Sequence, residues 1–228
     1  AAGNMPDEGS LSGTTKAVEL ATKAGEGETI IVLVSGGGSA LLTLPVAGIS
    51  LADKLAATKA LVRAGASIQQ LNTVRKHLSL VKGGQLAAAA YPATVVGLVL
   101  SDVVGDPLDV IASGPTVCDT SSYQDALAVI DSLSALSSLP PSVVDHLKRG
   151  AAGNAGVSET PKEGDKRLQS ASTNIVGSNR IAANAAIFEA QALGYAADVA
   201  TLELNGDTSD AALMVAATVR QLLAAAEG

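Results

Sequence analysis

TIIVLVSGGGSALL, residues 29–42, is the stretch that decides the fold. It opens with five apolar residues, 30–34, of which four are β-branched, so it predicts a strand buried on both faces, as in a parallel sheet. A glycine turn follows directly: Ser35, Gly36, Gly37, Gly38 and Ser39. Residues 40–42 then resemble the first turn of a helix, with Ser39 as its N-cap. This combination favours anion binding, because unpaired backbone N–H groups point into one concavity.

The glycine turn does not identify its ligand. No Gly-Lys-Ser/Thr follows the glycines, so the turn is not a Walker A loop, and it lacks the spacing of the dinucleotide fingerprint. A tight turn that needs glycine for steric reasons alone is the alternative interpretation. Its position at the carboxyl end of an apolar strand favours binding, because open α/β sheets bind ligands at that edge.

A second apolar run, residues 94–100, predicts another buried strand, and Asp102 and Asp106 come just after it. Carboxylates at this edge of a sheet suit a magnesium ion or a general base, although each aspartate could instead start a turn. A further turn of small residues contains Ser113, Gly114 and Thr116. We expect the glycine turn, Asp102 and this second turn to converge on one cleft.

Basic residues gather between the two predicted strands, at Arg75, Lys76, His77 and Lys82. A helix through this stretch would present Arg75, Ser79 and Lys82 on one side. Guanidinium and ammonium groups bind phosphates and carboxylates, so we predict contact with a phosphate or the substrate. The alternative is a solvated helix face.

The composition excludes several classes of protein. The 228 residues suffice for one large or two small domains, with 47% hydrophobic but only 2% aromatic residues. A net charge of −7 and the scarcity of aromatics disfavour nucleic-acid binding. No apolar run reaches transmembrane length. Cys118 is the single cysteine, which excludes an internal disulfide and fits a reducing compartment, and His77 and His146 lack neighbours at zinc-ligand spacing.

The rest of the chain alternates between strand and helix patterns. Residues 150–170 lack periodicity and predict an exposed, flexible excursion. Beyond them we predict a strand at 174–177, a helix at 181–193, a strand at 197–204 and a helix at 209–226. The fold class predicted is α/β, a Rossmann-like doubly wound, mainly parallel sheet with helices on both faces.

Three long motifs carry a family resemblance: SGGGSALL at 35–42, VRKHLSLVKGG at 74–84 and SDVVGDPLDVIASGPT at 101–116. With NIVGSN at 174–179, which ends in Asn179, they resemble the glycerate kinases of the second type, also known by their carboxy-terminal MOFRL domain. The resemblance implies ATP-dependent phosphorylation of D-glycerate, usually to 2-phosphoglycerate, with Mg²⁺ and in the cytoplasm. It also implies a cleft between a Rossmann-like domain and the carboxy-terminal domain.

The chain departs from that family in length. Family members are about twice as long, and the upstream Gly-Lys-Ala motif and the downstream motifs of the MOFRL domain are absent from residues 1–228. We therefore interpret the chain as the central part of the amino-terminal α/β domain. The missing carboxy-terminal domain would be its partner, and we expect this piece alone to be inactive.

Phosphoryl transfer needs positioning, charge neutralisation and a metal rather than covalent chemistry from the protein. We assign anion binding to the glycine turn, with Lys76, the second turn and Asn179 as further contacts. Arg75 and Lys82 would offset negative charge, and Asp102 or Asp106 would hold Mg²⁺ or accept the hydroxyl proton. The alternatives are a non-catalytic anion- or nucleotide-binding domain and an enzyme of the sugar-phosphate isomerase type, which dependence on ATP distinguishes from a kinase.

Overall fold

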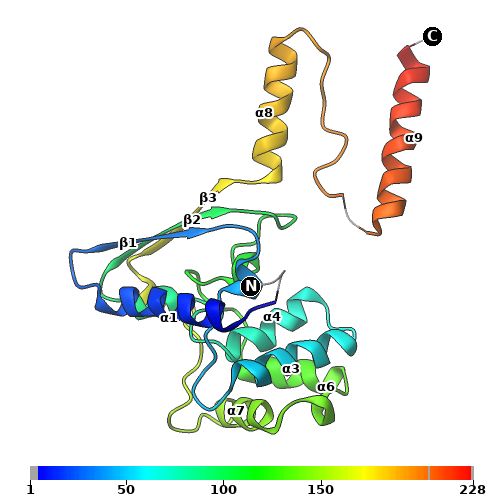
Figure 1. Cartoon of the computed structure of the whole chain (residues 1–228). Helices are drawn as coiled ribbons and strands as arrows, with labels where there is room; N and C mark the ends of the chain where they lie inside the picture. Colours follow the sequence, from blue (N-terminus) through cyan, green and yellow to red (C-terminus); the bar gives the residue numbers. More distant parts are fainter. Residues whose placement is uncertain (1–4, 205, 227–228) are drawn as a thin grey trace. The chain divides into compact units, whose positions relative to one another are not determined.

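The computed structural model describes residues 5–204 and 206–226, which form two compact units that divide between Ser178 and Asn179. The first unit contains a three-stranded parallel sheet in the order β1 (Thr29–Val34), β2 (Thr94–Leu100) and β3 (Ala171–Gly177) (Figure 1). β1 and β2 pair in register from Thr29↔Thr94 to Val34↔Val99. Both apolar runs therefore form parallel strands, as predicted, but only β2 has a strand on each side, whereas β1 lies at the edge of the described sheet.

Two helices cover one face of this sheet. α1 (Glu8–Lys23) and α5 (Gln85–Ala90) share a small core with Ile30, Val32 and Val95. The intervening residues point to the opposite face, because side chains alternate along a strand. There Ile31 is 63% exposed and Leu33 77% exposed, so the expectation that β1 is buried on both faces is wrong for this chain.

A larger aliphatic core lies among four helices: α3 (Leu51–Arg63), α4 (Ile68–His77), α6 (Tyr123–Ser132) and α7 (Pro141–Ala151). Capping boxes start three of them, with side-chain and backbone bonds between Ser50 and Asp53, Ser67 and Gln70, and Ser122 and Asp125. Pro141 occupies the first turn of α7, where its missing N–H is tolerated. Local signals therefore fix where these helices begin.

The basic stretch is not one continuous helix. α4 ends at His77, and Leu78 is its C-cap. Ser79 then forms an antiparallel bridge with Pro45. Lys82 consequently lies beyond the helix, so the predicted helical face with Arg75, Ser79 and Lys82 on one side is wrong.

The segment predicted as an exposed excursion, residues 150–170, is partly anchored. It contains a short 3₁₀ helix, η3 (Lys166–Leu168), and Thr160 is only 3% exposed. Bonds to α4 and α6 hold this segment, and no helix or strand periodicity could have revealed them.

The second unit contains α8 (Asn179–Ala192) and α9 (Thr208–Ala226). Both helices were predicted. The strand predicted at 197–204 is wrong, because these residues have no strand structure. An alternating pattern forms a strand only where a neighbouring strand accepts its hydrogen bonds. Within the described ranges, every helix is too short or too polar to cross a membrane.

Candidate functional site

The glycine turn connects β1 to a short helix, α2 (Gly38–Leu41). Gly37 is the N-cap of this helix, with φ of 84° and no side-chain cap bond, so the prediction of Ser39 as N-cap is wrong. A left-handed backbone strongly favours glycine, because a β-carbon would be strained there. Ser39 instead lies inside the helical turn, and its carbonyl accepts hydrogen bonds from Arg75 and Lys82.

Two of the glycines allow close approach of other segments. A β-carbon on Gly36 would lie 2.8 Å from Oδ2 of Asp102, and one on Gly38 would lie 2.9 Å from the β-carbon of Ala112. The structure thus brings the glycine turn, the exposed carboxylate after β2 and the turn around Ala112 together. Side chains larger than hydrogen would push these three segments apart.

The turn after Asp106 has an unusual backbone. Ala112, Ser113 and Gly114 have φ angles of 51°, 63° and 60°, in the 3₁₀ turn η1 (Ile111–Ser113) and just after it. For the alanine and the serine this left-handed conformation costs roughly 1–2 kcal/mol per residue. Such strain persists where surrounding contacts hold it and is frequent at functional sites.

Other segments do hold this turn. The carbonyl of Ser113 accepts from the N–H of Gly83 at 2.9 Å, and its buried hydroxyl donates to Asn72 Oδ1 at 3.2 Å. The Thr116 hydroxyl shares a 2.8 Å hydrogen bond with Thr173 of β3. The Ser113 and Thr116 side chains therefore bind other parts of the protein, and their role in ligand binding stays a prediction.

Arg75 and Lys82 both contact the glycine turn, although they do not share a helix face as predicted. The Lys82 ammonium donates to the carbonyls of Ser39 at 2.8 Å and Ala112 at 3.3 Å, and the Arg75 guanidinium also donates to Ser39. Lys82 is 1% exposed, and burial, with the charges of Arg75 and Lys54, lowers its pKa. A lysine ammonium has three donors, so these two bonds leave a third.

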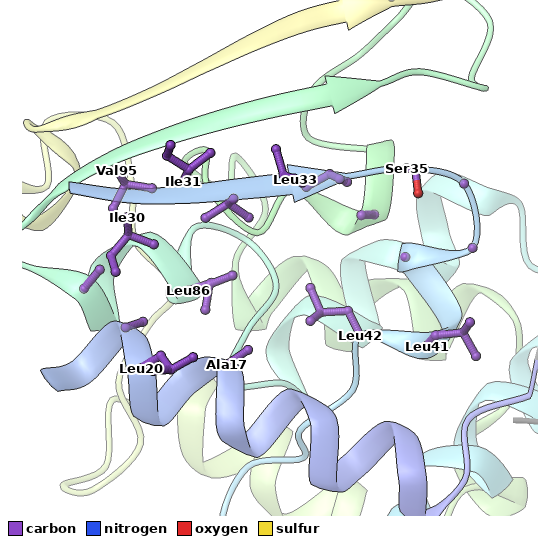
Figure 2. Close-up of a pocket in the computed structure, with 18 of the residues that line it drawn as sticks. Ala17, Leu20, Ile30, Ile31, Leu33, Ser35, Leu41, Leu42, Leu86 and Val95 are labelled. Atoms are coloured by element: carbon purple, nitrogen blue, oxygen red, sulfur yellow. The ribbon is translucent and has the colours of Figure 1, made fainter. Parts of the chain in front are cut away.

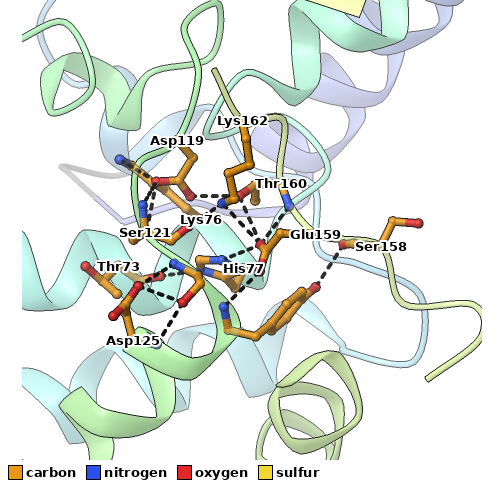
Figure 3. Close-up of polar contacts among 12 residues, drawn as sticks. Thr73, Lys76, His77, Asp119, Ser121, Asp125, Ser158, Glu159, Thr160 and Lys162 are labelled. Carbon is orange, nitrogen blue, oxygen red and sulfur yellow. Dashed lines mark hydrogen bonds and ion pairs between the residues drawn. The ribbon is translucent and has the colours of Figure 1, made fainter. Parts of the chain in front are cut away.

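Lys76 points to a different set of partners (Figure 3). Its ammonium lies 3.3 Å from Asp119 Oδ1 and 3.5 Å from Asp109 Oδ2. Asp119 also accepts from Ser121 and from the Thr160 hydroxyl. Burial opposes ionisation of this carboxyl, but the Lys76 charge and the Ser121 bonds outweigh it and lower the Asp119 pKa. The predicted anion-binding role of Lys76 competes with this ion pair and stays a prediction.

A second part of the same network joins the two histidines. His77 Nε2 lies 2.9 Å from Glu159 Oε1, and the hydroxyl of Tyr123 lies 3.1 Å from His146 Nε2. The Tyr123 ring also packs against both imidazoles. These contacts fix residues 158–162 against α4 and α6 (Figure 3). In the described part of the chain, no three His, Cys, Asp or Glu side chains gather as a metal site.

Sequence reasoning missed Lys54. This lysine is on α3 and only 4% exposed, and its ammonium has no hydrogen-bond partner among the described residues. Burial, reinforced by the charge of Arg75, lowers its pKa to about 7. The signal was present in the sequence, because Lys54 shares the buried face of the helix with Ala57 and Leu61 at helical spacing.

An apolar cavity of about 550 Å³ lies beside the glycine turn. Figure 2 shows its wall of β1 side chains, with Leu20 of α1 below them and Ser35 where the strand ends. None of the described residues that line it is charged. A charged substrate group would therefore be bound by the glycine turn and its basic neighbours rather than by the aliphatic walls.

The other residues singled out in the sequence are described by their own local contacts rather than by a contact with the glycine turn. Asp106 has a left-handed backbone, with φ of 56°, in the loop that follows Asp102. Asn179 begins α8 in the second unit, where its amide donates to the carbonyl of Leu202 at 3.4 Å. Cys118 is a free, half-buried thiol.

Comparisons with known proteins agree on a family. The family described as "Domain of unknown function (DUF4147)" matches residues 1–148. A glycerate 2-kinase of Pyrococcus horikoshii is 41% identical over 218 residues, which are 96% of this chain and 48% of that protein. A glycerate kinase of Rattus norvegicus is 43% identical over 90% of this chain and 38% of its own length.

Solved structures agree with the sequence relatives. A crystal structure of a Pyrococcus horikoshii protein has a TM-score of 0.78 and 42% identity, over 86% of this chain and 43% of that one. The glycerate kinase of Thermotoga maritima has a TM-score of 0.77 and 40% identity, over 88% and 45%. They confirm the α/β class with a parallel sheet.

This chain spans about half the length of the Pyrococcus horikoshii glycerate 2-kinase and of the two solved structures. The match to the Pyrococcus horikoshii relative extends over 96% of this chain and therefore includes all three motifs at 35–42, 74–84 and 101–116. The chain therefore belongs to the DUF4147 family, the amino-terminal domain of the glycerate 2-kinases.

Proposed function

We propose that this chain is part of an enzyme that transfers a phosphoryl group from ATP to D-glycerate. The observation that carries the proposal is the convergence on the glycine turn: Asp102 lies against Gly36, while Arg75 and Lys82 both bind the carbonyl of Ser39. Positive charge, backbone N–H groups and a carboxylate gathered at one turn suit phosphoryl transfer. The relatives named as glycerate kinases support the choice of substrate.

Each group has a proposed part in this reaction. The N–H groups of residues 35–39 bind phosphate oxygens, and the third donor of Lys82 offsets their charge. Arg75 holds the turn in place through Ser39 and adds positive charge. Lys76 and Asn179 remain proposed outer contacts. Asp102 is exposed and adjoins the turn, so it accepts the proton of the glycerate hydroxyl or helps to hold a metal ion.

Magnesium is the metal that this proposal implies. Mg²⁺ at phosphate sites is usually held by one or two carboxylates together with substrate phosphates and water. The Asp102 oxygen beside the bare backbone of Gly36 fits this mode, with Asp106 a few residues along the same loop as the second candidate. Bound there, the ion would neutralise charge on the phosphate oxygens.

The proposal includes the rest of the enzyme and its surroundings. A carboxy-terminal MOFRL domain would supply the second wall of the cleft, which excludes water and keeps the phosphates in line. The free thiol of Cys118 supports a reducing, cytoplasmic location.

The test is D-glycerate-dependent formation of ADP in the presence of Mg²⁺, measured on the product of the complete reading frame and on residues 1–228 alone. We expect turnover by the complete protein and none by this piece. Turnover that needs no ATP would favour the isomerase alternative, and ligand binding without turnover would favour the non-catalytic domain. Substantial turnover by residues 1–228 would show that one wall suffices.

A further inference from the structure

Three basic side chains are gathered behind the glycine turn, and their charges are not balanced. Arg75 and Lys82 donate to backbone carbonyls, while the charge of Arg75 acts on Lys54 and the charge of Lys54 acts on Lys82. Two nitrogen atoms of this group make no hydrogen bond with the described residues, Nζ of Lys54 and Nε of Arg75. Both atoms are buried.

Lys76 provides a comparison within the same protein, because it is a buried lysine with carboxylate partners. It is as deeply buried as Lys54, at 4% exposed, and it has Asp119 and Asp109 as partners. A buried cation without a partner is costly, and neighbouring like charges add to that cost. Burial and Arg75 lower the Lys54 pKa to about 7, which reflects the same absence of a counter-charge. The unfilled donors therefore match an anion rather than a structural ion pair.

We propose that Lys54, together with Arg75 and Lys82, binds a small oxyanion group, a carboxylate or a phosphate, and that Lys54 contacts it directly. Carboxylate and phosphate oxygens accept from ammonium and guanidinium donors, which is the chemistry that these unfilled donors present. Because these atoms are shielded from water, we expect the long lysine side chain to move aside as the anion enters. The proposal rests on the proposed function in one respect, which is the molecule that carries the oxyanion. That molecule would be glycerate, through its carboxylate, or ATP, through a phosphate.

The test uses thermal denaturation of the product of the complete reading frame, titrated separately with inorganic phosphate, D-glycerate and MgATP, with NaCl holding the ionic strength constant. Lys54→Met keeps most of the side-chain length without the charge. Lys59→Met is the matched control, because Lys59 is exposed on the same helix. Lys54→Gln is the second variant, in case the methionine protein does not fold.

We expect saturable stabilisation of the wild-type chain by at least one of the three probes. Lys54→Met should weaken that binding about 10- to 100-fold, as expected for one hydrogen bond to a charged group. It should also raise the melting temperature without ligand, because it removes an unpaired buried charge. Lys59→Met should bind as the wild type does. The probe whose binding depends on Lys54 identifies the source of the group.

Two results would overturn the proposal. One is a wild-type chain that no probe stabilises beyond NaCl, and the other is a Lys54 variant that binds as tightly as the wild type. The proposed function fails separately: Lys54-dependent binding with no glycerate-dependent use of ATP by the complete protein would leave the anion site standing. Glycerate-dependent turnover by the complete protein, with unchanged anion binding in the Lys54 variants, would support the proposed kinase function and reject the Lys54 site.

Discussion

The α-carbon of Gly36 and the carboxylate of Asp102 lie side by side across the carboxyl ends of two paired strands. A β-carbon on Gly36 would come within 2.8 Å of Oδ2 of Asp102. The two residues reach this position because Val34 and Val99, just before them in the chain, pair in register. A glycine at position 36 therefore sets where the carboxylate can lie.

Gly36→Ala should lower glycerate-dependent turnover of the complete protein by about 10-fold or more, through displacement of Asp102. The unfolding free energy should change by less than about 1 kcal/mol, because the displaced atom is the end of an exposed side chain. Gly13→Ala is the control, since Gly13 lies within α1 with no atom within 4 Å of the new methyl group. That control should gain about 0.5–1 kcal/mol of stability with unchanged turnover. Equal kinetics in the two variants would contradict a role for the Asp102 position.

Lys82→Met should reduce ATP-linked turnover about 30- to 900-fold, which corresponds to a transition-state contribution of about 2–4 kcal/mol. The effect on the unfolding free energy should be smaller, about 1 kcal/mol. Loss of the bonds to Ser39 and Ala112 is partly offset because a desolvated cation is also removed. Steady-state kinetics and urea denaturation measure the two effects. A large loss of stability with normal kinetics per folded molecule would make Lys82 purely structural.

Asp119 and Asp109 share the ammonium of Lys76 but differ in burial, so they should differ in effect. The Asp119 side chain is fully buried, whereas that of Asp109 is 42% exposed. Asp119→Ala should cost about 3–5 kcal/mol of unfolding free energy, because it leaves Lys76 charged and unpaired. Asp109→Ala should cost less than about 1 kcal/mol. Urea denaturation of both variants is the measurement, and similar costs would contradict the expected effect of burial on the two ion pairs.

The contact between Glu159 and His77 should make stability depend on acidic pH. Burial alone would raise the Glu159 pKa, but bonds from His77 and from the N–H groups of Tyr123 and Thr160 outweigh it and lower the pKa to about 2. A carboxyl with a lowered pKa in the folded state stabilises above its unfolded pKa, and that stability is lost as the pH falls towards the folded value. The window is therefore about pH 5 to 2.

Glu159→Gln should flatten this dependence. The melting temperature of the wild type should fall more steeply than that of the variant between pH 5 and 2. Glu163→Gln, an exposed change in the same segment, is the control and should follow the wild type. Parallel curves for the wild type and Glu159→Gln would show that the contact contributes nothing measurable to acid stability.

Most helices and strands of this fold follow from short-range patterns in the sequence. The strand patterns at 30–34 and 94–100 and the helix starts at Ser50, Ser67 and Ser122 depend on neighbours within a few residues, and the structure has them all. The prediction of a strand at 197–204 was wrong because a strand also needs a neighbouring strand to pair with, and its own sequence pattern does not specify one.

The sequence also indicated which segments form the site, but not how they meet. The folded structure shows that Arg75 and Lys82, 36 and 43 residues from Ser39, bind the same carbonyl, and that α4 ends between them. It also decided that Lys76 has Asp119 as a partner while Lys54 has none among the described residues. Such pairings depend on the path of the chain between distant residues and on which charges the core excludes from water, and no local pattern encodes either.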